Sequence, residues 1–215
     1  MQLEPGVLEA LGSCFVTGTD TGVGKTHVTC LLLRTLRGMG RDAVGYKPVC
    51  SGDRDDPIAL QAAGGGKLSL DEVNPLYLQT PVAPRVAGRL EKIVIDGAAL
   101  LEGFHHLARR HRVVLVEGAG GWLVPLSENS TMEDLAISMR LPVLVVAANK
   151  LGAINHTLLT VRAIEASGLV LRGVVLNHVS LDETPATQSN AGILREVLGD
   201  KLLGECSFCG QPAES

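Results

Sequence analysis

The sequence feature that most constrains the fold is a glycine-rich loop between an apolar run and an amphipathic segment. The stretch "GTDTGVGKT" contains Gly18, Gly22 and Gly24 and ends in Lys25 and Thr26. Such glycines let the backbone turn tightly and point N–H groups at phosphate oxygens, and the helix that follows adds its positive end. Lys25 would reach the β- and γ-phosphates, and the Thr26 hydroxyl would coordinate Mg²⁺. The spacing is unusual, because five residues, not four, separate Gly18 from Gly24.

Short apolar runs alternate with helix-like segments along the rest of the chain. We expect strands at 13–18, 42–49, 112–121, 141–150 and 171–179, and helices at 25–37, 55–64, 96–110, 131–139, 154–167 and 189–199. This alternation predicts an α/β fold of the three-layer P-loop NTPase type, with a mostly parallel central sheet and helices on both faces. Residues 64–95, with "AGGGK" and several prolines, are predicted to be loop with short edge structure.

Length and charge limit the domain count and the possible partners. The 215 residues suit a single domain, with residues 1–12 as an N-terminal extension and 206–215 as a short tail. The net charge of -4 argues against nucleic acid as the main partner, because binding to phosphate backbones needs a basic face. No apolar run is long enough for a membrane span, and the opening residues do not resemble a secretory signal. We therefore expect a cytoplasmic protein.

The five cysteines show no disulfide framework, which is typical of a reducing compartment. Cys206 and Cys209 form a single C-x-x-C. A metal or redox role for this pair is not favoured, because no second pair or histidine stands at zinc-like spacing.

Residues suited to ligand binding stand where the predicted strands end. They are Thr17 and Gly18, Lys47, Glu117, Asn149 and Lys150, and Asn177. Ligands of parallel sheets bind at the carboxyl ends of the strands, and core packing has no need of charged or amide side chains there. Together these positions predict a ligand site.

Carboxylates near these strand ends are candidates for the metal site that the phosphate loop implies. Glu117 ends "VVLVEG", where a Walker-B acid would lie. Asp55 and Asp56 precede a predicted helix and are a second source. Asp56 on its own would be interpreted as a helix N-cap, and Asp53 and Asp55 compete with it for that role.

Lys47 is a second lysine that simple nucleotide binding does not require. "GYKPVCSG" places it at a strand end, and a lysine there is costly to bury unless it meets negative charge. It would suit a reaction in which an anionic intermediate attacks a phosphoryl group, and Ser51 could hydrogen-bond the same substrate. The alternative is a surface lysine whose ammonium extends into solvent.

Five motifs together resemble one enzyme family. "TGTDTGVGKT", "GYKPVCSG", "VEGAGGWLVPL", "KLGAINH" and "LLGE" occur in the order and spacing of dethiobiotin synthetases, over residues 14–205. The resemblance implies ATP- and Mg²⁺-dependent joining of CO₂ to 7,8-diaminononanoate, through a carbamate and a carbamic-phosphoric anhydride, to give dethiobiotin, ADP and phosphate. It also implies a homodimer with the substrate site at its interface.

The resemblance also implies roles for individual residues. Lys25, Lys47 and Thr21 would act on the carbamate and the phosphoryl group, and Asn177 would read adenine. Asp56 is favoured over its neighbours as a metal ligand. His27, His156 and His178 are neighbours of the motifs, not acid–base catalysts.

The resemblance implies three sets of binding residues. The ATP-binding set is Gly22, Val23, Gly24, Lys25, Thr26, His27, Asp56, Glu117, Gly118, Ala119, Gly120, Asn177 and His178. The metal set is Thr26, Asp56 and Glu117. The substrate set is Lys47, Ser51, Gly118, Gly152, Ala153, Ile154 and Asn155.

Two positions depart from the family pattern. Gly22 stands where some members carry a glutamate, and the chain continues after Glu205 as "CSFCGQPAES", where members usually have an Ile-Pro segment that walls the adenine pocket. A broadened nucleotide preference is the hypothesis that this tail motivates.

Two other classes share the fold. An ATP-driven switch of the partition or septum-positioning type (ParA/MinD-like) would not need Lys47 and Ser51, and the acidic charge counts against it. A cobyrinate-type amidating synthase would need an added glutamine-hydrolysing domain, for which the length leaves no room.

Overall fold

A seven-stranded sheet forms the centre of the molecule in the computed structural model, which describes residues 1–3 and 6–208. The strand order is β1-β9-β8-β7-β2-β6-β3, and every pairing is parallel except that of β1 with β9. A second sheet pairs β4 with β5 in parallel. The strands are β1 Gln2–Leu3, β2 Cys14–Gly18, β3 Ala43–Tyr46, β4 Val49–Ser51, β5 Leu76–Leu78, β6 Val113–Gly121, β7 Val143–Ala148, β8 Leu171–Asn177 and β9 Leu202–Cys206.

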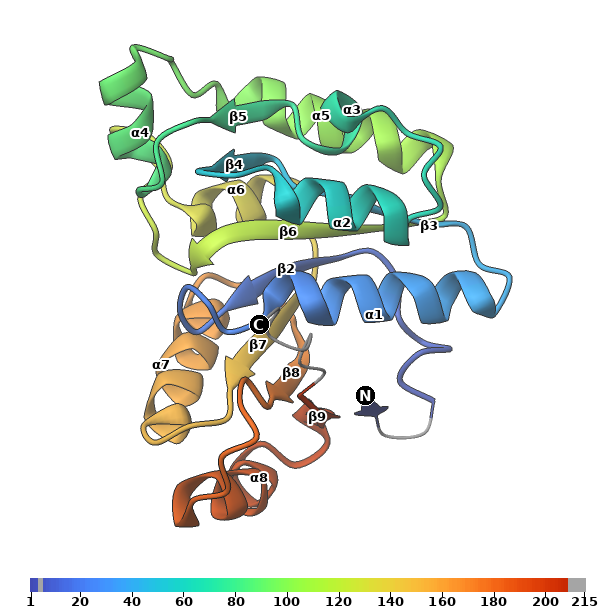
Figure 1. Ribbon diagram of the computed structural model, residues 1–215, viewed down its shortest axis with the longest axis vertical. Coiled ribbons are helices and arrows are strands. Elements are labelled where there is room, and N and C mark those ends of the chain that lie inside the picture. The colour runs from blue at the N-terminus through green and yellow to red at the C-terminus, as the bar shows by residue number, and fades with distance from the viewer. Residues whose placement is uncertain (4–5, 209–215) are drawn as a thin grey trace, which may run out of the picture.

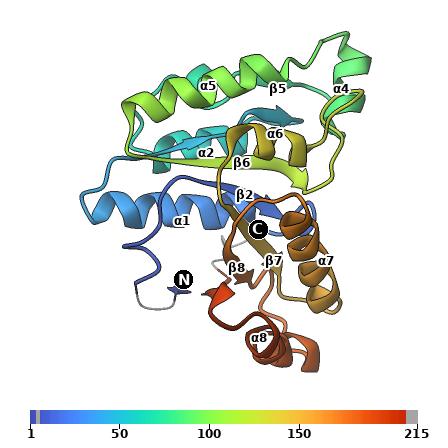
Figure 2. The ribbon, with the colours of Figure 1, turned by 180° about the vertical axis from the view of Figure 1, so that it is seen from behind.

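Helices cover both faces of the large sheet. Helices α1 and α2 lie in front of it in Figure 1, and α5, α6 and α7 lie in front of it when the molecule is seen from behind in Figure 2. This arrangement confirms the predicted three-layer α/β fold. The helices are α1 Lys25–Gly38, α2 Asp55–Ala63, α3 Leu70–Val73, α4 Pro84–Glu91, α5 Gly97–Arg110, α6 Met132–Met139, α7 Ala153–Ala166 and α8 Pro185–Leu198, followed by the 3₁₀ turn Gly199–Lys201.

The composition of the central strands follows from burial on both faces. All residues of β2 and β7 are buried, and the apolar part of β6, Val113–Val116, is fully covered. Strands enclosed in this way are near-continuous runs of aliphatic residues, since neither face meets water. Polar residues therefore collect at the strand ends, where the covering helices stop.

Two predicted boundaries are wrong for identifiable reasons. The strand expected at 42–49 ends at Tyr46, and β4 begins at Val49 in the other sheet, because Pro48 has no N–H to continue the ladder. Helix α8 begins at Pro185, earlier than the expected residue 189. Its start is fixed by the Thr184 side chain, which accepts a hydrogen bond from the backbone N–H of Thr187, and by proline in the first turn.

The two ends of the chain are more ordered than expected. In the predicted extension 1–12, Gln2 and Leu3 form β1 and pair with Glu205 and Gly204 of β9, a strand that we did not predict. Cys206 is buried at the end of that strand and so is not tail. Cys209 lies outside the described residues, as do residues 210–215 of the predicted tail.

The irregular segment 64–95 contains the expected short edge structure and two helices that we did not predict, the single-turn α3 and the longer α4. Strand β5 gives β4 its partner, and α4 begins after Ala83 with proline in its first turn. Within the described part of the chain, no helix has both the length and the apolar character that crossing a membrane requires.

Helix α5 is fixed to the sheet by a buried hydroxyl. Tyr46 donates a 2.7 Å hydrogen bond to the carbonyl oxygen of Leu100, and a Cβ added at Gly103 would lie 2.5 Å from the same hydroxyl oxygen. We expect Gly103→Ala to lower the free energy of unfolding by about 1–3 kcal/mol through overpacking. Tyr46→Phe alone should cost about 1 kcal/mol through the lost hydrogen bond.

The double variant separates these effects. Without the hydroxyl oxygen at 2.5 Å, the nearest ring atom to the added Cβ is Cζ at 3.3 Å, so the crowding is relieved in part. The double variant Tyr46→Phe/Gly103→Ala should therefore be destabilised by less than the sum of the single changes in urea unfolding. Simple additivity would contradict this account of the α5 contact.

Candidate active site

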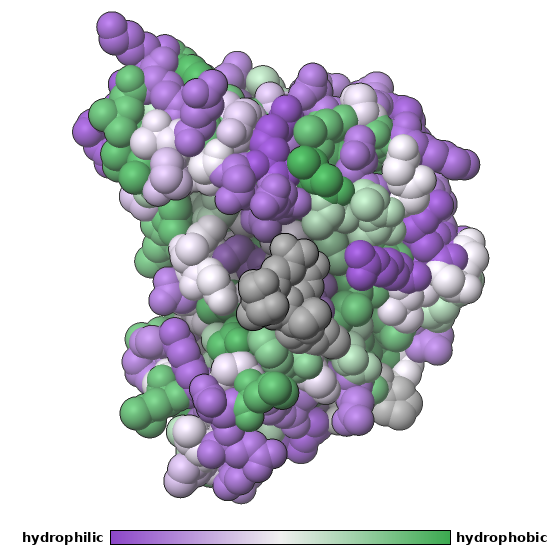
Figure 3. Space-filling model, in the orientation of Figure 1, coloured by the Kyte–Doolittle hydropathy of each residue, from purple (hydrophilic) through white to green (hydrophobic). Residues whose placement is uncertain are grey.

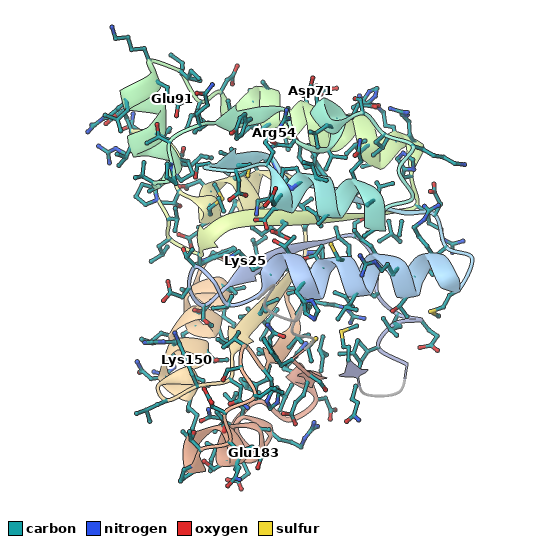
Figure 4. The ribbon with its side chains drawn as sticks, in the orientation of Figure 1. Lys25, Arg54, Asp71, Glu91, Lys150 and Glu183 are labelled. Carbon is teal, nitrogen blue, oxygen red and sulfur yellow. The ribbon has the colours of Figure 1, made fainter. Side chains whose placement is uncertain are left out.

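The glycine-rich loop joins β2 to α1 and is bent by left-handed glycines. Gly22 and Gly24 have φ values of +73° and +84°, which other residues rarely adopt, and α1 begins directly after Gly24. Lys25 lies at the start of α1, beside the end of β2 (Figure 4). Its Nζ donates a 3.1 Å hydrogen bond to the carbonyl oxygen of Asp20, within the same loop. The loop thus combines backbone N–H groups, a helix N-terminus and an ammonium group in one place.

Four side chains from different elements meet beside this loop. Lys47, which follows β3, places its Nζ 2.6 Å from Oε1 of Glu117 in β6 and 2.9 Å from Oδ2 of Asp56 in the first turn of α2. Thr26, in the first turn of α1, donates a 2.7 Å hydrogen bond from Oγ1 to the same Glu117 oxygen. All four residues were predicted from sequence, and the structure brings them together.

Burial and charge act against each other in this cluster. Glu117 is 0% exposed and Lys47 is 3% exposed. Burial alone would lower the pKa of the Lys47 ammonium, but the Glu117 and Asp56 carboxylates outweigh it and raise the pKa above its ordinary value. Burial and then the positive charge of Lys47 lower the pKa of Lys25 to about 8. Burial opposes ionisation of Asp56, yet Lys47 holds the pKa of that carboxyl below its usual range.

The oxygen atoms of the cluster fit a hard divalent cation. Thr26 and Glu117 present a hydroxyl and a carboxylate in contact, and the Asp56 carboxylate is bound to the same Lys47 ammonium as Glu117. Oε2 of Glu117 is buried and has no hydrogen-bond partner, so this carboxylate has unused capacity. Within the described ranges no cluster of three His, Cys, Asp or Glu residues is present, so phosphate oxygens and water would complete the coordination.

A cavity of about 580 Å³ lies between the loop and the opposite wall. On the face shown in Figure 3 the surface is hollowed beside its middle, and hydrophilic residues lie within the hollow. The predicted residues Lys25, Lys47 and Ser51 line this cavity. The complete lining is Thr21, Gly22, Gly24, Lys25, Thr26, Lys47, Cys50, Ser51, Asp56, Pro81, Val82, Ala83, Pro84, Ala119, Gly120 and Val124.

Part of that lining was not predicted. Cys50 and Val124 line the cavity, and residues 81–84 form the wall opposite the loop. Ser51 Oγ donates a 2.8 Å hydrogen bond to the carbonyl oxygen of Val82 in that wall. The prolines of residues 81–84 were the only signal in the sequence for this wall, and they indicated only a loop.

Several predicted nucleotide residues lie outside this cavity. Gly118 is buried, and a Cβ there would lie 3.0 Å from the Phe15 ring, so its missing side chain serves packing. The Asn177 amide faces the loop from behind, and the Nε2 of His27 is buried without a partner. His178 Nε2 lies 2.8 Å from Oε2 of Glu205.

The start of α7 lines a separate cavity of about 660 Å³. Gly152, Ile154 and Asn155 line it together with residues of α8, whereas Ala153 is buried. Lys150, beside α7 in Figure 4, is exposed. Asn190 fixes the turn from within, because its Nδ2 donates to Asn149 Oδ1 at 2.8 Å and to the Lys150 carbonyl oxygen at 3.0 Å.

The sheet, the loop and the carboxylate–lysine cluster define a nucleotide-binding protein of the P-loop class. Residues 13–208 match the family described as "AAA domain". Proteins named ATP-dependent dethiobiotin synthetase from Akkermansia muciniphila and an Anaeromyxobacter strain are each 45% identical, covering 88% and 93% of this chain and 89% and 92% of theirs. The same enzyme of Serratia marcescens is 39% identical, over 92% of this chain and 91% of its own. The chain belongs to the dethiobiotin synthetase family.

Solved structures of other proteins share the fold. A ParA family ATPase from Chlorobium tepidum has a TM-score of 0.56 at 10% identity, covering 92% of this chain and 85% of its own. MinD from Aquifex aeolicus, in a complex with MinC, has a TM-score of 0.54 at 16% identity, covering 94% and 83%. At such identities the likeness shows the fold alone.

The stability of the site depends on the pairing of Lys47 with Glu117. We expect Lys47→Met to lower the free energy of unfolding by about 3–5 kcal/mol, because it leaves a buried carboxylate without its cation. Glu117→Gln in the same chain removes that carboxylate charge. The double variant should therefore regain most of the loss in urea unfolding at neutral pH. A double variant that is less stable than Lys47→Met would show that the pair does not carry this energy.

Proposed function

We propose that this protein catalyses the ATP-dependent carboxylation and ring closure of 7,8-diaminononanoate with CO₂, giving dethiobiotin, ADP and phosphate. The observation that carries the proposal is Lys47, a buried ammonium group in the same cavity as the phosphate loop. Binding a nucleotide does not require a second buried lysine, whereas transfer of a phosphoryl group to an anionic acceptor does benefit from one. Membership in the dethiobiotin synthetase family supports the same reaction.

The reaction balances in three steps. One amine nitrogen of the substrate attacks CO₂ and loses a proton, which gives a carbamate. A carbamate oxygen attacks the γ-phosphorus of ATP, the bond to the bridging oxygen breaks, and ADP leaves. The second amine nitrogen then attacks the carbonyl carbon of the carbamic-phosphoric anhydride, phosphate leaves, and loss of a proton completes the five-membered ureido ring.

The residues of the cavity supply charge at the places where this chemistry develops it. Backbone N–H groups of the loop and the ammonium of Lys25 hold the β- and γ-phosphates, and Lys47 stabilises the carbamate and the charge on the transferred group. Thr21 and Ser51, which line the cavity, contact the substrate. Thr26, Asp56 and Glu117 would hold Mg²⁺, which when bound neutralises phosphate charge.

The nucleoside end of ATP is assigned to the strand ends beyond the loop. Ala119 and Gly120 line the cavity, and Asn177, the last residue of β8, is followed by His178 on the other side of the loop. We propose that Asn177 contacts the adenine base and that His178 lies beside it.

A direct assay tests the proposal. Incubation with diaminononanoate, ¹³C-bicarbonate and Mg·ATP should give dethiobiotin labelled in its ureido carbonyl, detected by mass spectrometry. We expect Lys47→Ala to lower kcat about 10²–10³-fold, which is typical for removal of a group that stabilises developing charge. Lys67→Ala, at an exposed lysine, is the matched control and should keep full activity. ATP turnover that ignores the diamine would overturn the proposal.

We further propose that the active unit is a homodimer in which the start of α7 binds the substrate carboxylate in the partner's cavity. Two observations support this. The cavity at Gly152 and Asn155 shares no lining residue with the phosphate-loop cavity of its own chain. Leu151, directly before this helix start, is 85% exposed. Free N–H groups at a helix N-terminus suit an anion.

Mixing two inactive variants tests the composite site. Asn155→Asp places a negative charge beside the carboxylate, and Lys47→Ala removes the lysine, so each homodimer should be nearly inactive. Co-expression with different tags should restore about a quarter of wild-type activity, because half of the dimers are mixed and each mixed dimer has one intact site. A catalytically active monomer in light-scattering chromatography, or no regained activity, would contradict the composite site.

A further inference from the structure

The phosphate loop is held from behind by a side chain that stands far away in the sequence. Nδ2 of Asn177, at the end of β8, donates a 2.9 Å hydrogen bond to the carbonyl oxygen of Val23 in the loop. Strand β7 lies between β8 and β2, so the amide reaches the loop across an intervening strand end. Asn177 is 3% exposed and Val23 is also buried, so water does not compete for this bond.

The direction of this bond matters for phosphate binding. All peptide bonds of the described residues are trans, and in a trans peptide the C=O and the following N–H point in opposite directions. A Val23 carbonyl turned toward Asn177 therefore turns the Gly24 N–H away from Asn177. Gly24 lines the cavity, whereas Val23 and Asn177 do not. The bond thus fixes a peptide unit whose N–H belongs to the phosphate-binding side of the loop.

The loop is shaped to accept this amide. A Cβ added at Gly24 would overlap Nδ2 of Asn177, and Gly24 has a φ of +84°. The Val23 carbonyl oxygen can accept a hydrogen bond but cannot donate one. The Asn177 amide must therefore face it with its nitrogen, which is the donor. Oδ1 of Asn177 is buried and has no hydrogen-bond partner. A buried acceptor without a partner costs free energy, and the bond made by the nitrogen of the same amide offsets part of that cost.

We propose that Asn177 is a positioning residue for the phosphate loop, and that its bond to Val23, the Asn177 clamp, orients the loop for the triphosphate. The inference rests on the proposed ATP-dependent function, because the clamp acts on the loop that would bind ATP. It differs from a role in reading adenine, because a clamp affects ligands that have no base.

Inorganic tripolyphosphate with Mg²⁺ separates the two roles, because it carries the phosphates and no nucleoside. We expect Asn177→Ala to lower the affinity for tripolyphosphate about five- to tenfold in calorimetry, which is the effect of one buried hydrogen bond. The affinity for ATP should fall by at least as much. Asn190→Ala, which removes another buried asparagine at the same end of the sheet, is the matched control and should leave tripolyphosphate affinity unchanged. Loss of ATP affinity with unchanged tripolyphosphate affinity would overturn the clamp.

Hydrogen exchange tests the clamp without any ligand. In the Asn177→Ala protein, backbone amides of residues 19–26 should exchange several-fold faster while those of β7 and α7 stay as in the wild type. Equal loop exchange in the two proteins would overturn the proposal. If Asn177→Ala does not fold, Asn177→Asp keeps the size of the side chain, removes the donor that the Val23 carbonyl oxygen needs, and should give the same two changes.

A wild-type protein that binds neither tripolyphosphate nor ATP would instead count against the proposed function. The exchange comparison would still decide on the clamp.

Discussion

The buried contact between Lys47 and Glu117 is the interaction on which the rest of the site depends. Glu117 stands at the end of the apolar part of β6 with no exposed surface, and a carboxylate in such a place is stable only beside a cation or strong donors. Lys47 and Thr26 supply both. Because the three residues come from β6, the end of β3 and the start of α1, their contact also fixes where these elements stop relative to one another.

The chemistry proposed for this chain depends on this cluster and not on the sheet. ParA and MinD proteins have a similar arrangement of strands and helices at 10–16% identity, so the fold does not decide the chemistry. We propose that the chemistry is set by the way the chain leaves β3. Pro48 ends the strand, the chain turns into a second small sheet, and the turn directs Lys47 toward the phosphate loop. The position of Lys47 therefore depends on the point where β3 ends.

Much of this arrangement could be predicted from sequence, and the remainder could not, for physical reasons. Lys25, Thr26, Lys47 and Glu117 lie at strand ends or in the loop, and parallel strands bring such positions to one edge. Asp56 was ambiguous among neighbouring acids, because only the turn of α2 decides which carboxylate faces Lys47. The wall at 81–84 and the strand β9 depend on pairing between distant segments, and local patterns do not encode that pairing. The contact of Asn177 with Val23 joins residues 154 positions apart and is invisible to any local pattern.

The pairing of β1 with β9 has a consequence for how the molecule meets its neighbours. An uncovered edge strand offers unpaired N–H and C=O groups to strands of other molecules. Two residues, Gln2 and Leu3, cover part of that edge, and Gly204 permits their close approach because a side chain there would overlap the Gln2 carbonyl oxygen. The opposite edge strand, β3, is four residues long, and all four are buried beside α2 and α3. The sheet is thus protected at one edge by a very short strand and at the other by helices, which leaves the ends of its strands as its open surface for ligands.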